Sequence, residues 1–112
     1  MIDHYEFGRI TVDGKAYTSD IIIFPDHVDG HWWRREGHEL CVDDLGKILP
    51  EKPEFLVVGT GHAGLVRILD ETKSFLLSCG IEFIAEPTTQ ACKIYNWLAP
   101  TKKVIAALHL TC

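Results

Sequence analysis

A glycine-rich segment near the middle of the chain has the residue types and spacing of an anion-binding turn. The apolar run 55–58 is too short for a helix and predicts a buried strand. It is followed by Gly59–Gly64, in which three glycines have the spacing Gly-x-Gly-x-x-Gly. Because glycine leaves the backbone amides uncovered, such a turn can hold an anion. The hydroxyl of Thr60 and the imidazole of His62 would add polar groups beside it.

The same spacing occurs in dinucleotide-binding folds, where the last glycine opens a helix that holds the pyrophosphate. Here the next helix is expected to begin at Asp70, six residues after Gly64, so the glycines do not open it. Binding of a small anion is still a hypothesis for this turn, because the turn follows a strand at the edge where α/β sheets commonly bind ligands. This candidate small-anion site comprises Gly59, Thr60, Gly61 and His62, with Arg34, His38 and Asn96 able to converge on it. The alternatives are a plain tight turn and, for Asn96, a structural role in satisfying backbone groups.

The segment Trp32-Trp33-Arg34-Arg35 is a candidate interface. In a short strand, adjacent side chains point to opposite faces, so the two tryptophans cannot enter the same layer. One of Trp32 and Trp33 is expected in the core. The other, with Arg35, would form an interface anchor, because Trp and Arg are enriched among such anchors. The equally weighted alternative is that a helix or loop covers the second face.

No set of residues predicts catalysis, a metal or a cofactor. His27, His31 and His38 lie near two aspartates, but they fall in a loop and lack the second spaced ligand pair that a metal needs. A nucleophilic Cys112 would need a base, and His109 lies on the opposite face of an extended tail. No Ser-His-Asp order or paired-carboxylate motif is present. We therefore expect no metal or cofactor and favour a non-enzymatic protein.

Composition sets the remaining limits. With 112 residues, 46% hydrophobic and 24% charged, the chain predicts a single globular domain spanning 1–112. The net charge of −5 and the lack of a basic cluster argue against nucleic acid as a partner. No apolar run is long enough to span a bilayer, and the start does not resemble a signal peptide, so we expect a cytoplasmic protein. The four cysteines are then expected to be reduced thiols, with Cys79 and Cys92 buried on helices.

The helices and strands that position these residues are predicted from the periodicity of apolar residues and from glycines and prolines, which mark the ends of such elements. An amino-terminal β-hairpin turning at Asp13-Gly14 comes first and either extends the main sheet or forms a small second one. A β-α-β-α-β order follows and implies a parallel sheet with helices packed on it. The expected strands are 5–12, 15–24, 31–35, 55–58, 65–69, 81–85 and 104–108, and the expected helices are 42–49, one beginning at Asp70 and ending near Gly80, and one from Thr88 or Thr89 to Leu98.

The order of several short motifs resembles a known family. These motifs are Phe7-Gly8, Gly14 with Tyr17, Trp33-Arg34 with Gly37 and His38, Gly59-Thr60-Gly61, Gly80, Thr89-x-Ala91, Tyr95-Asn96, and His109-Leu110-Thr111-Cys112. Together they resemble the small adipogenesis-associated domain-of-unknown-function family, related to a mitochondrial respiratory complex I assembly factor and common as short archaeal and bacterial proteins. The resemblance implies a three-layer α/β fold around a mixed sheet and action through protein partners. The chain departs from the family at Thr101-Lys102-Lys103, where a glycine and a basic residue are usual.

These observations favour a non-enzymatic module that binds protein partners in assembly or regulation of a larger complex. A homodimer through either face stays open. The alternative is binding of a small anion, or an unknown activity, at the Gly59-Thr60-Gly61 turn.

Overall fold

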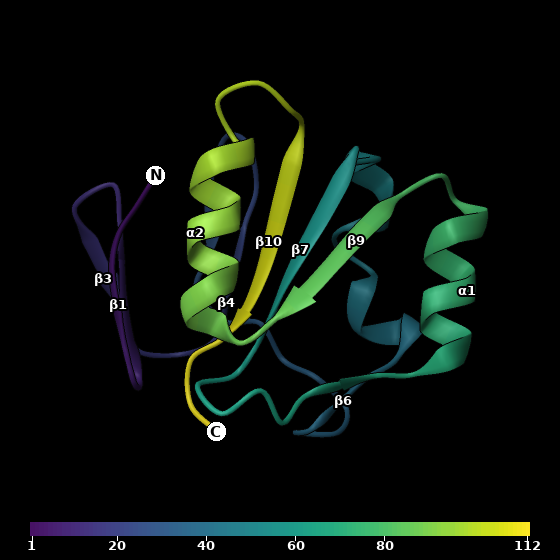
Figure 1. Ribbon diagram of the computed structural model, residues 1–112, viewed down its shortest axis with the longest axis horizontal. Helices are drawn as coiled ribbons and strands as arrows, with labels where there is room; N and C mark the ends of the chain where they lie inside the picture. Colours follow the sequence, from purple (N-terminus) through teal and green to yellow (C-terminus); the bar gives the residue numbers. More distant parts are fainter.

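A mixed five-stranded sheet lies at the centre of the computed structural model, which describes residues 1–112 (Figure 1). Its strand order is β5-β4-β10-β7-β9. The strands are β4 (Ile21–Ile23), β5 (Val28–Asp29), β7 (Phe55–Thr60), β9 (Glu82–Glu86) and β10 (Val104–His109). β10, β7 and β9 are parallel, whereas β4 is antiparallel to β10 and β5 is antiparallel to β4. The carboxyl ends of the three parallel strands therefore meet at one edge.

Each face of this sheet is covered by a different layer. Helix α2 (Thr88–Leu98) and the strands β1 (Ile2–Glu6) and β2 (Arg9–Val12) pack on one face. With β3 (Lys15–Tyr17), these strands form a separate three-stranded antiparallel sheet. The other face packs against α1 (Asp70–Ser78), the 3-10 helices η1 (Val42–Leu45) and η2 (Leu49–Glu51), and the short parallel pair β6 (Glu39–Leu40) and β8 (Arg67–Ile68). The predicted three-layer α/β fold is confirmed.

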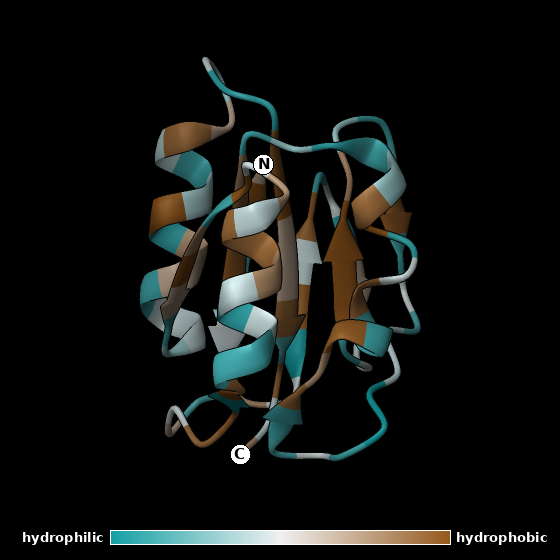
Figure 2. Ribbon diagram, turned by 90° about the vertical axis from the view of Figure 1, so that its right-hand side faces the viewer, coloured by the Kyte–Doolittle hydropathy of each residue, from teal (hydrophilic) through white to brown (hydrophobic).

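The two apolar layers arise because the central strands are apolar on both faces. Along β10, Val104, Ala106 and Leu108 contact the α2 layer, while Ile105 and Ala107 contact the α1 layer. Figure 2 shows the central strands hydrophobic over most of their length and the connecting loops mostly hydrophilic. A fully buried Leu or Ile contributes about 1.5–3 kcal/mol, so these strands hold the layers together. Neither helix is long and apolar enough to cross a membrane.

The amino-terminal region departs from prediction in its strand boundaries. The hairpin at Asp13-Gly14 is confirmed, since Val12 faces Lys15 across it. The expected single strand 5–12 is wrong: Glu6 pairs with Arg9, so the chain turns at Phe7-Gly8. The expected strand 15–24 is also wrong, because β3 and β4 belong to different sheets.

Two further elements differ from prediction. Residues 31–35 form no strand, and 42–49 forms 3-10 turns interrupted near Gly46 where an α-helix was expected. The later elements are confirmed within one or two residues. Helix α1 begins at Asp70, which is its first residue, while Leu69 takes the N-cap position. The glycines of the turn therefore do not open a helix.

Candidate functional site

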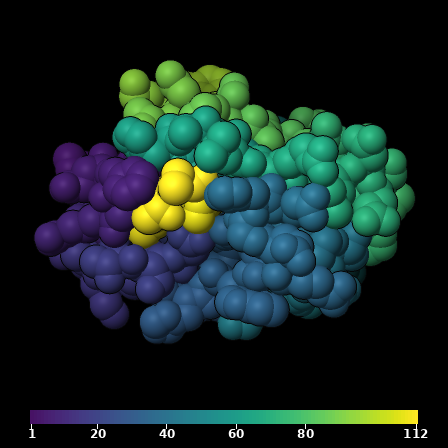
Figure 3. Space-filling view, turned by 90° about the horizontal axis from the view of Figure 1, so that it is seen from below, coloured from purple at the N-terminus to yellow at the C-terminus, as the bar shows by residue number.

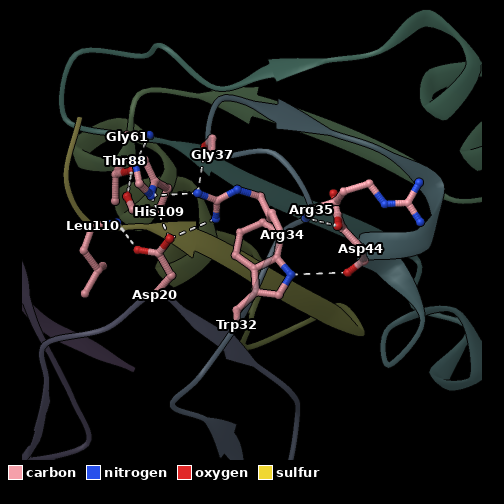
Figure 4. Close-up of polar contacts among 10 residues, drawn as sticks. All are labelled: Asp20, Trp32, Arg34, Arg35, Gly37, Asp44, Gly61, Thr88, His109 and Leu110. Atoms are coloured by element: carbon pink, nitrogen blue, oxygen red, sulfur yellow. Dashed lines mark hydrogen bonds and ion pairs between the residues drawn. The ribbon is translucent and has the colours of Figure 1, made fainter.

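A polar cluster lies at the carboxyl ends of β7 and β10, on the face of the sheet that packs against α1. On this face the apolar side chains of β10 are followed by His109, and those of β7 are followed by Thr60, which stands in register with His109. Asp20 immediately precedes the antiparallel strand β4, and Arg34 enters from the segment 31–35, which forms no strand. Figure 4 shows Asp20, Arg34 and His109 pointing toward one another. Residues far apart in the sequence thus form one buried group.

The contacts within this cluster are short and shielded from water. The Asp20 Oδ2 atom lies 2.9 Å from Nη1 of Arg34 and 2.7 Å from Nδ1 of His109. The exposed fractions of the side chains are 5% for Arg34, 18% for Asp20 and 10% for His109. Arg34 Nη2 donates to the Gly37 carbonyl at 2.9 Å, and the Leu110 N–H donates to Asp20 Oδ1 at 2.9 Å. The charged pair is therefore hydrogen-bonded on several sides, as a buried ion pair requires.

The hydrogen-bond network assigns the proton on the His109 ring. A carboxylate can only accept, so the 2.7 Å contact with Asp20 places a proton on Nδ1 of His109. Arg34 Nη2 lies 3.0 Å from the same nitrogen but then donates to the Gly37 carbonyl instead. Burial opposes ionisation of Asp20, but hydrogen bonds from His109, Leu110 and Arg34 outweigh it and hold the Asp20 pKa below its usual value. Asp20 is thus the anion to which Arg34 and His109 are anchored.

Two nitrogen atoms in this cluster have no hydrogen-bond partner within the chain. They are Nε2 of His109 and Nε of Arg34, and both are fully buried. An Asp-His pair with a free Nε2 has the parts of a general base, but a base must reach the proton that it removes. Here Nε2 is enclosed by protein. The cluster therefore acts in this structure as a clamp between segments.

The glycine turn is fastened to the same region by its backbone. The N–H of Gly61 donates to Thr88 Oγ1 at 2.9 Å, and the N–H of His62 donates to the Thr111 carbonyl at 2.8 Å. The N–H of Gly64 donates to the Gly61 carbonyl at 3.1 Å. These amides are satisfied within the chain, so they are not available to an anion. The expected use of this turn as an amide cradle for an anion is not supported, because residues of the carboxyl-terminal tail, α2 and the turn itself already accept these hydrogen bonds.

Glycine is required at two positions of this turn by close packing. A Cβ on Gly61 would lie 2.8 Å from the Thr111 carbonyl oxygen and 2.9 Å from Cδ2 of His109, and the residue has a φ of +105°. A Cβ on Gly59 would lie 2.9 Å from Thr88 Oγ1. Gly59 lies inside β7, and because it has no side chain the start of α2 can pack closely against the sheet. The Thr88 hydroxyl also donates to the His109 carbonyl at 2.6 Å, which joins turn, helix and strand.

The segment Trp32–Arg35 alternates between buried and exposed side chains. Trp32 is buried, and its Nε1 donates to the Asp44 carbonyl at 3.2 Å. Arg34 is buried too, and its guanidinium carbon lies 4.7 Å from the centre of the Trp32 ring. Trp33 is 77% exposed, and Arg35 is exposed and paired with Asp43 at 2.6 Å. The prediction that one tryptophan lies in the core is confirmed for Trp32, and the alternative that a helix or loop covers the second face is wrong, because Trp33 is exposed.

The remaining predicted site residues do not all gather at the glycine turn. His38 is exposed, and its ring centre lies 6.4 Å from that of His109, with an edge-on geometry. His62 is exposed and lies against the amino-terminal region, with its Nδ1 atom 3.4 Å from the Tyr5 hydroxyl. Asn96 bonds to both backbone groups of Ile2, at 2.9 and 2.8 Å, and lies about 12 Å along α2 from Thr88. The structural role of Asn96 was the alternative expectation, and it is confirmed.

The carboxyl-terminal residues connect these parts. Seen from below, they (yellow) lie between the amino-terminal segment (purple), the glycine turn (teal) and the segment near residue 40 (blue) (Figure 3). The Leu110 carbonyl accepts from the Gly8 N–H at 2.9 Å and from the Tyr5 hydroxyl at 3.0 Å. The tail therefore packs against the amino-terminal strands and the end of the central sheet.

The thiols and histidines form no metal-binding group. No three His, Cys, Asp or Glu side chains lie together in a geometry that could hold a metal ion. Burial raises the pKa of the Cys92 thiol to about 12, in agreement with its predicted position in the core. Cys79 is exposed at the end of α1, so its predicted burial is wrong. The apolar face of this helix is carried by Leu76 instead.

Comparison with known proteins places the chain in a family. The family model described as a protein of unknown function (DUF498/DUF598) matches residues 2–109. The chain belongs to this family. The resemblance drawn from the sequence motifs is thereby confirmed.

Solved structures of similar proteins align with almost the whole chain. A conserved hypothetical protein from Pyrococcus horikoshii is 32% identical, with a TM-score of 0.86 over 100% of this chain and 99% of that one. An outer membrane protein from Bartonella henselae is 26% identical, with a TM-score of 0.84 over 99% and 94%. A protein from Bordetella parapertussis is 25% identical, with a TM-score of 0.77 over 98% and 94%. No curated protein sequence matches the chain significantly.

Proposed function

We propose that this protein is a non-enzymatic, cytoplasmic module that binds a protein partner through Trp33 and Arg35, in assembly or regulation of a larger complex. The observation that carries the proposal is the exposed indole of Trp33 on a backbone that is fixed on both sides. A second copy of the chain counts among the candidate partners, because the sequence left a homodimer open.

The backbone around Trp33 is held by its neighbours. On the amino-terminal side, the Trp32 N–H donates to the Asp20 carbonyl at 2.9 Å. On the carboxyl-terminal side, the Arg35 N–H donates to Asp44 Oδ1 at 2.9 Å, and Asp44 is itself buried. The buried side chains of Trp32 and Arg34 add three further hydrogen bonds, to Asp44, Asp20 and Gly37. The segment is therefore ordered before any partner arrives, which reduces the entropy lost on binding.

The surroundings of Trp33 have the composition of a binding hot spot. Trp and Arg are the residues most enriched among the anchors that carry binding energy, and Trp33 and Arg35 point outward from the same short segment. Beside Trp33 lies a shallow cavity of about 200 Å³, whose lining includes Asp43 and Lys47. These exposed charges of both signs would form the polar rim of such an interface. A net charge of −5 further favours a protein over a nucleic acid as the partner.

The test compares two tryptophans of equal exposure. Trp33 is 77% exposed and Trp97, on α2, is 78% exposed, so Trp97→Ala is a matched control for Trp33→Ala. Tagged wild-type and variant proteins at native abundance are used to capture partners from the source cells, with quantitative mass spectrometry as the readout. Loss of a hot spot costs at least about 2 kcal/mol, so Trp33→Ala should weaken partner binding about 30-fold. Trp97→Ala should capture the same partners as wild type.

Two results would overturn the proposal. One is a wild-type protein that returns only background proteins and no second copy of itself. The other is a Trp33→Ala variant, shown to be folded by circular dichroism, that retains the partners of the wild type.

A further inference from the structure

A groove separate from the Trp33 surface lies at the carboxyl ends of β7 and β9, on the α1-facing side. It has a volume of about 560 Å³, within the range of small-molecule sites, and its apolar wall includes Ile68, Phe83 and Ala85. Its rim carries Arg67, Lys73 and Glu86. In α/β folds this end of the sheet is where ligands bind. We refer to it as the β9 groove.

One polar side chain points into this groove without a partner. Thr60 continues the face of β7 that carries the buried Leu56 and Val58, and it is itself only 7% exposed. Its Oγ1 atom lies 3.6 Å from the position of a Cβ on Gly64, which also lines the groove. The Thr60 hydroxyl makes no hydrogen bond within the chain, and it is not among the fully buried unpaired atoms, so it stays open to the groove that Thr60 lines. A ligand in the groove can therefore accept a hydrogen bond from it.

The rim charges define the charge of the ligand. Arg67 is paired with Glu39 at 3.0 Å, whereas Lys73 has no carboxylate within ion-pair distance. The ammonium of Lys73 is therefore the cation available to a ligand. Glu86 also stands at the rim without a paired cation, and its negative charge opposes a second negative charge on a ligand. The rim thus suits a single negative charge.

We infer that the β9 groove binds a small monocarboxylate with an apolar body. The carboxylate would accept a hydrogen bond from the Thr60 hydroxyl and pair with Lys73, while the apolar body would pack on Phe83 and Ala85. The inference does not depend on the Trp33 surface, because the two sites share no residue. It also differs from the amide cradle considered for the glycine turn, since no backbone amide of that turn takes part.

The experiment is an NMR titration of the wild-type protein with hexanoate, 1-hexanol and inorganic phosphate. Hexanoate has the charge and the apolar chain, hexanol lacks the charge, and phosphate lacks the chain. We expect hexanoate to shift the amide signals of Thr60, Gly64 and 83–86 saturably, with a Kd on the order of 1 mM for so small a ligand. Hexanol and phosphate should bind at least about tenfold more weakly.

Two variants and one control test the assigned contacts. Thr60→Val keeps the side-chain shape but removes the hydroxyl, and Lys73→Met removes the charge. Each should raise the hexanoate Kd about tenfold or more, the effect of one hydrogen bond to a charged group. Lys102→Met removes an exposed lysine at the opposite end of the sheet and should leave the Kd within about twofold. The inference is overturned if hexanoate gives no saturable shifts at the groove, if hexanol or phosphate binds as tightly, or if folded Thr60→Val and Lys73→Met bind like the control.

Discussion

Replacement of Asp20 by alanine should destabilise the protein far more than the same replacement of an exposed aspartate, even though the exposed aspartate lies closer to its arginine. Asp20→Ala leaves the buried Arg34 guanidinium and the His109 Nδ1 without their carboxylate. Breaking a buried pair by removal of one partner costs about 3–5 kcal/mol, because the remaining charge is left uncompensated. The Leu110 N–H also loses its acceptor, which by itself costs about 1–3 kcal/mol when buried. Because these losses overlap, we expect about 3–5 kcal/mol in total, a large share of the stability of a domain of this size.

The control is Asp43→Ala. Asp43 lies 2.6 Å from Arg35, closer than Asp20 is to Arg34, but the two side chains are 68% and 64% exposed. An exposed pair of this kind contributes about 0–1 kcal/mol, so the geometrically shorter contact should be the weaker one. Urea unfolding followed by circular dichroism measures both. The double variant Asp20→Ala/Arg34→Met should recover part of the loss, because it removes the stranded charge as well.

The clamp account fails under either of two outcomes. The first is a loss for Asp20→Ala of less than about 1 kcal/mol, equal to that for Asp43→Ala. The second is a double variant less stable than Asp20→Ala alone, since that would mean that the unpaired guanidinium is not the source of the loss.

Three further predictions concern packing, thiols and pH. Gly61→Ala should lower the free energy of unfolding by at least about 2 kcal/mol, measured by heat or urea, because its Cβ would meet His109 and Thr111 and its φ is positive. Gly37→Ala is the control and should be nearly neutral, because nothing lies within 4 Å of a Cβ there. Equal losses of stability in the two variants would refute the packing argument. Alkylation with iodoacetamide at neutral pH, mapped by mass spectrometry, should label Cys79 in the folded protein and Cys92 only after unfolding, because Cys92 is buried with its pKa raised to about 12. The pKa of Asp20 is lower in the folded than in the unfolded protein, so its charged form stabilises the fold above the unfolded value of about 3.9, and this stability is lost as the pH falls through the folded pKa. Below about pH 4, the unfolding free energy of wild type should therefore fall more steeply than that of Asp20→Asn. Parallel plots of unfolding free energy against pH for the two proteins would contradict this.

The strands and helices of the carboxyl-terminal part were predictable because local signals agree with the tertiary structure there. The runs 55–58 and 104–108 are apolar on both faces, which only a sheet covered on both sides can bury. Gly80 ends α1 and Pro87 precedes α2, as their conformational preferences indicate. Prediction failed near Gly8, because a glycine within an alternating pattern fits both a bulge and a tight turn. The choice is decided by the tertiary contact of Gly8 with Leu110.

The polar cluster was not predictable as a unit. Asp20 and His109 are 89 positions apart, and Arg34 is 75 positions from His109. Nothing near Asp20 distinguishes it from a solvated turn residue, and Arg34 was expected at the glycine turn, not beside Asp20. The one usable signal was His109 itself, a polar residue that directly follows an apolar strand. For the Trp32–Arg35 segment, in contrast, simple alternation placed the two indoles on opposite faces with one in the core, and only the structure shows that Trp32 is buried and Trp33 exposed.

The measurement that bears most directly on the proposed function is the amount of partner that Trp33→Ala recovers relative to Trp97→Ala at native abundance. The two side chains are equally exposed, so they differ in the rigidity and chemistry of their surroundings and not in accessible area. We predict that Trp97→Ala recovers the wild-type partners and that Trp33→Ala recovers them with about 30-fold weaker binding. Equal recovery by the two folded variants would contradict the assignment of Trp33 as the anchor.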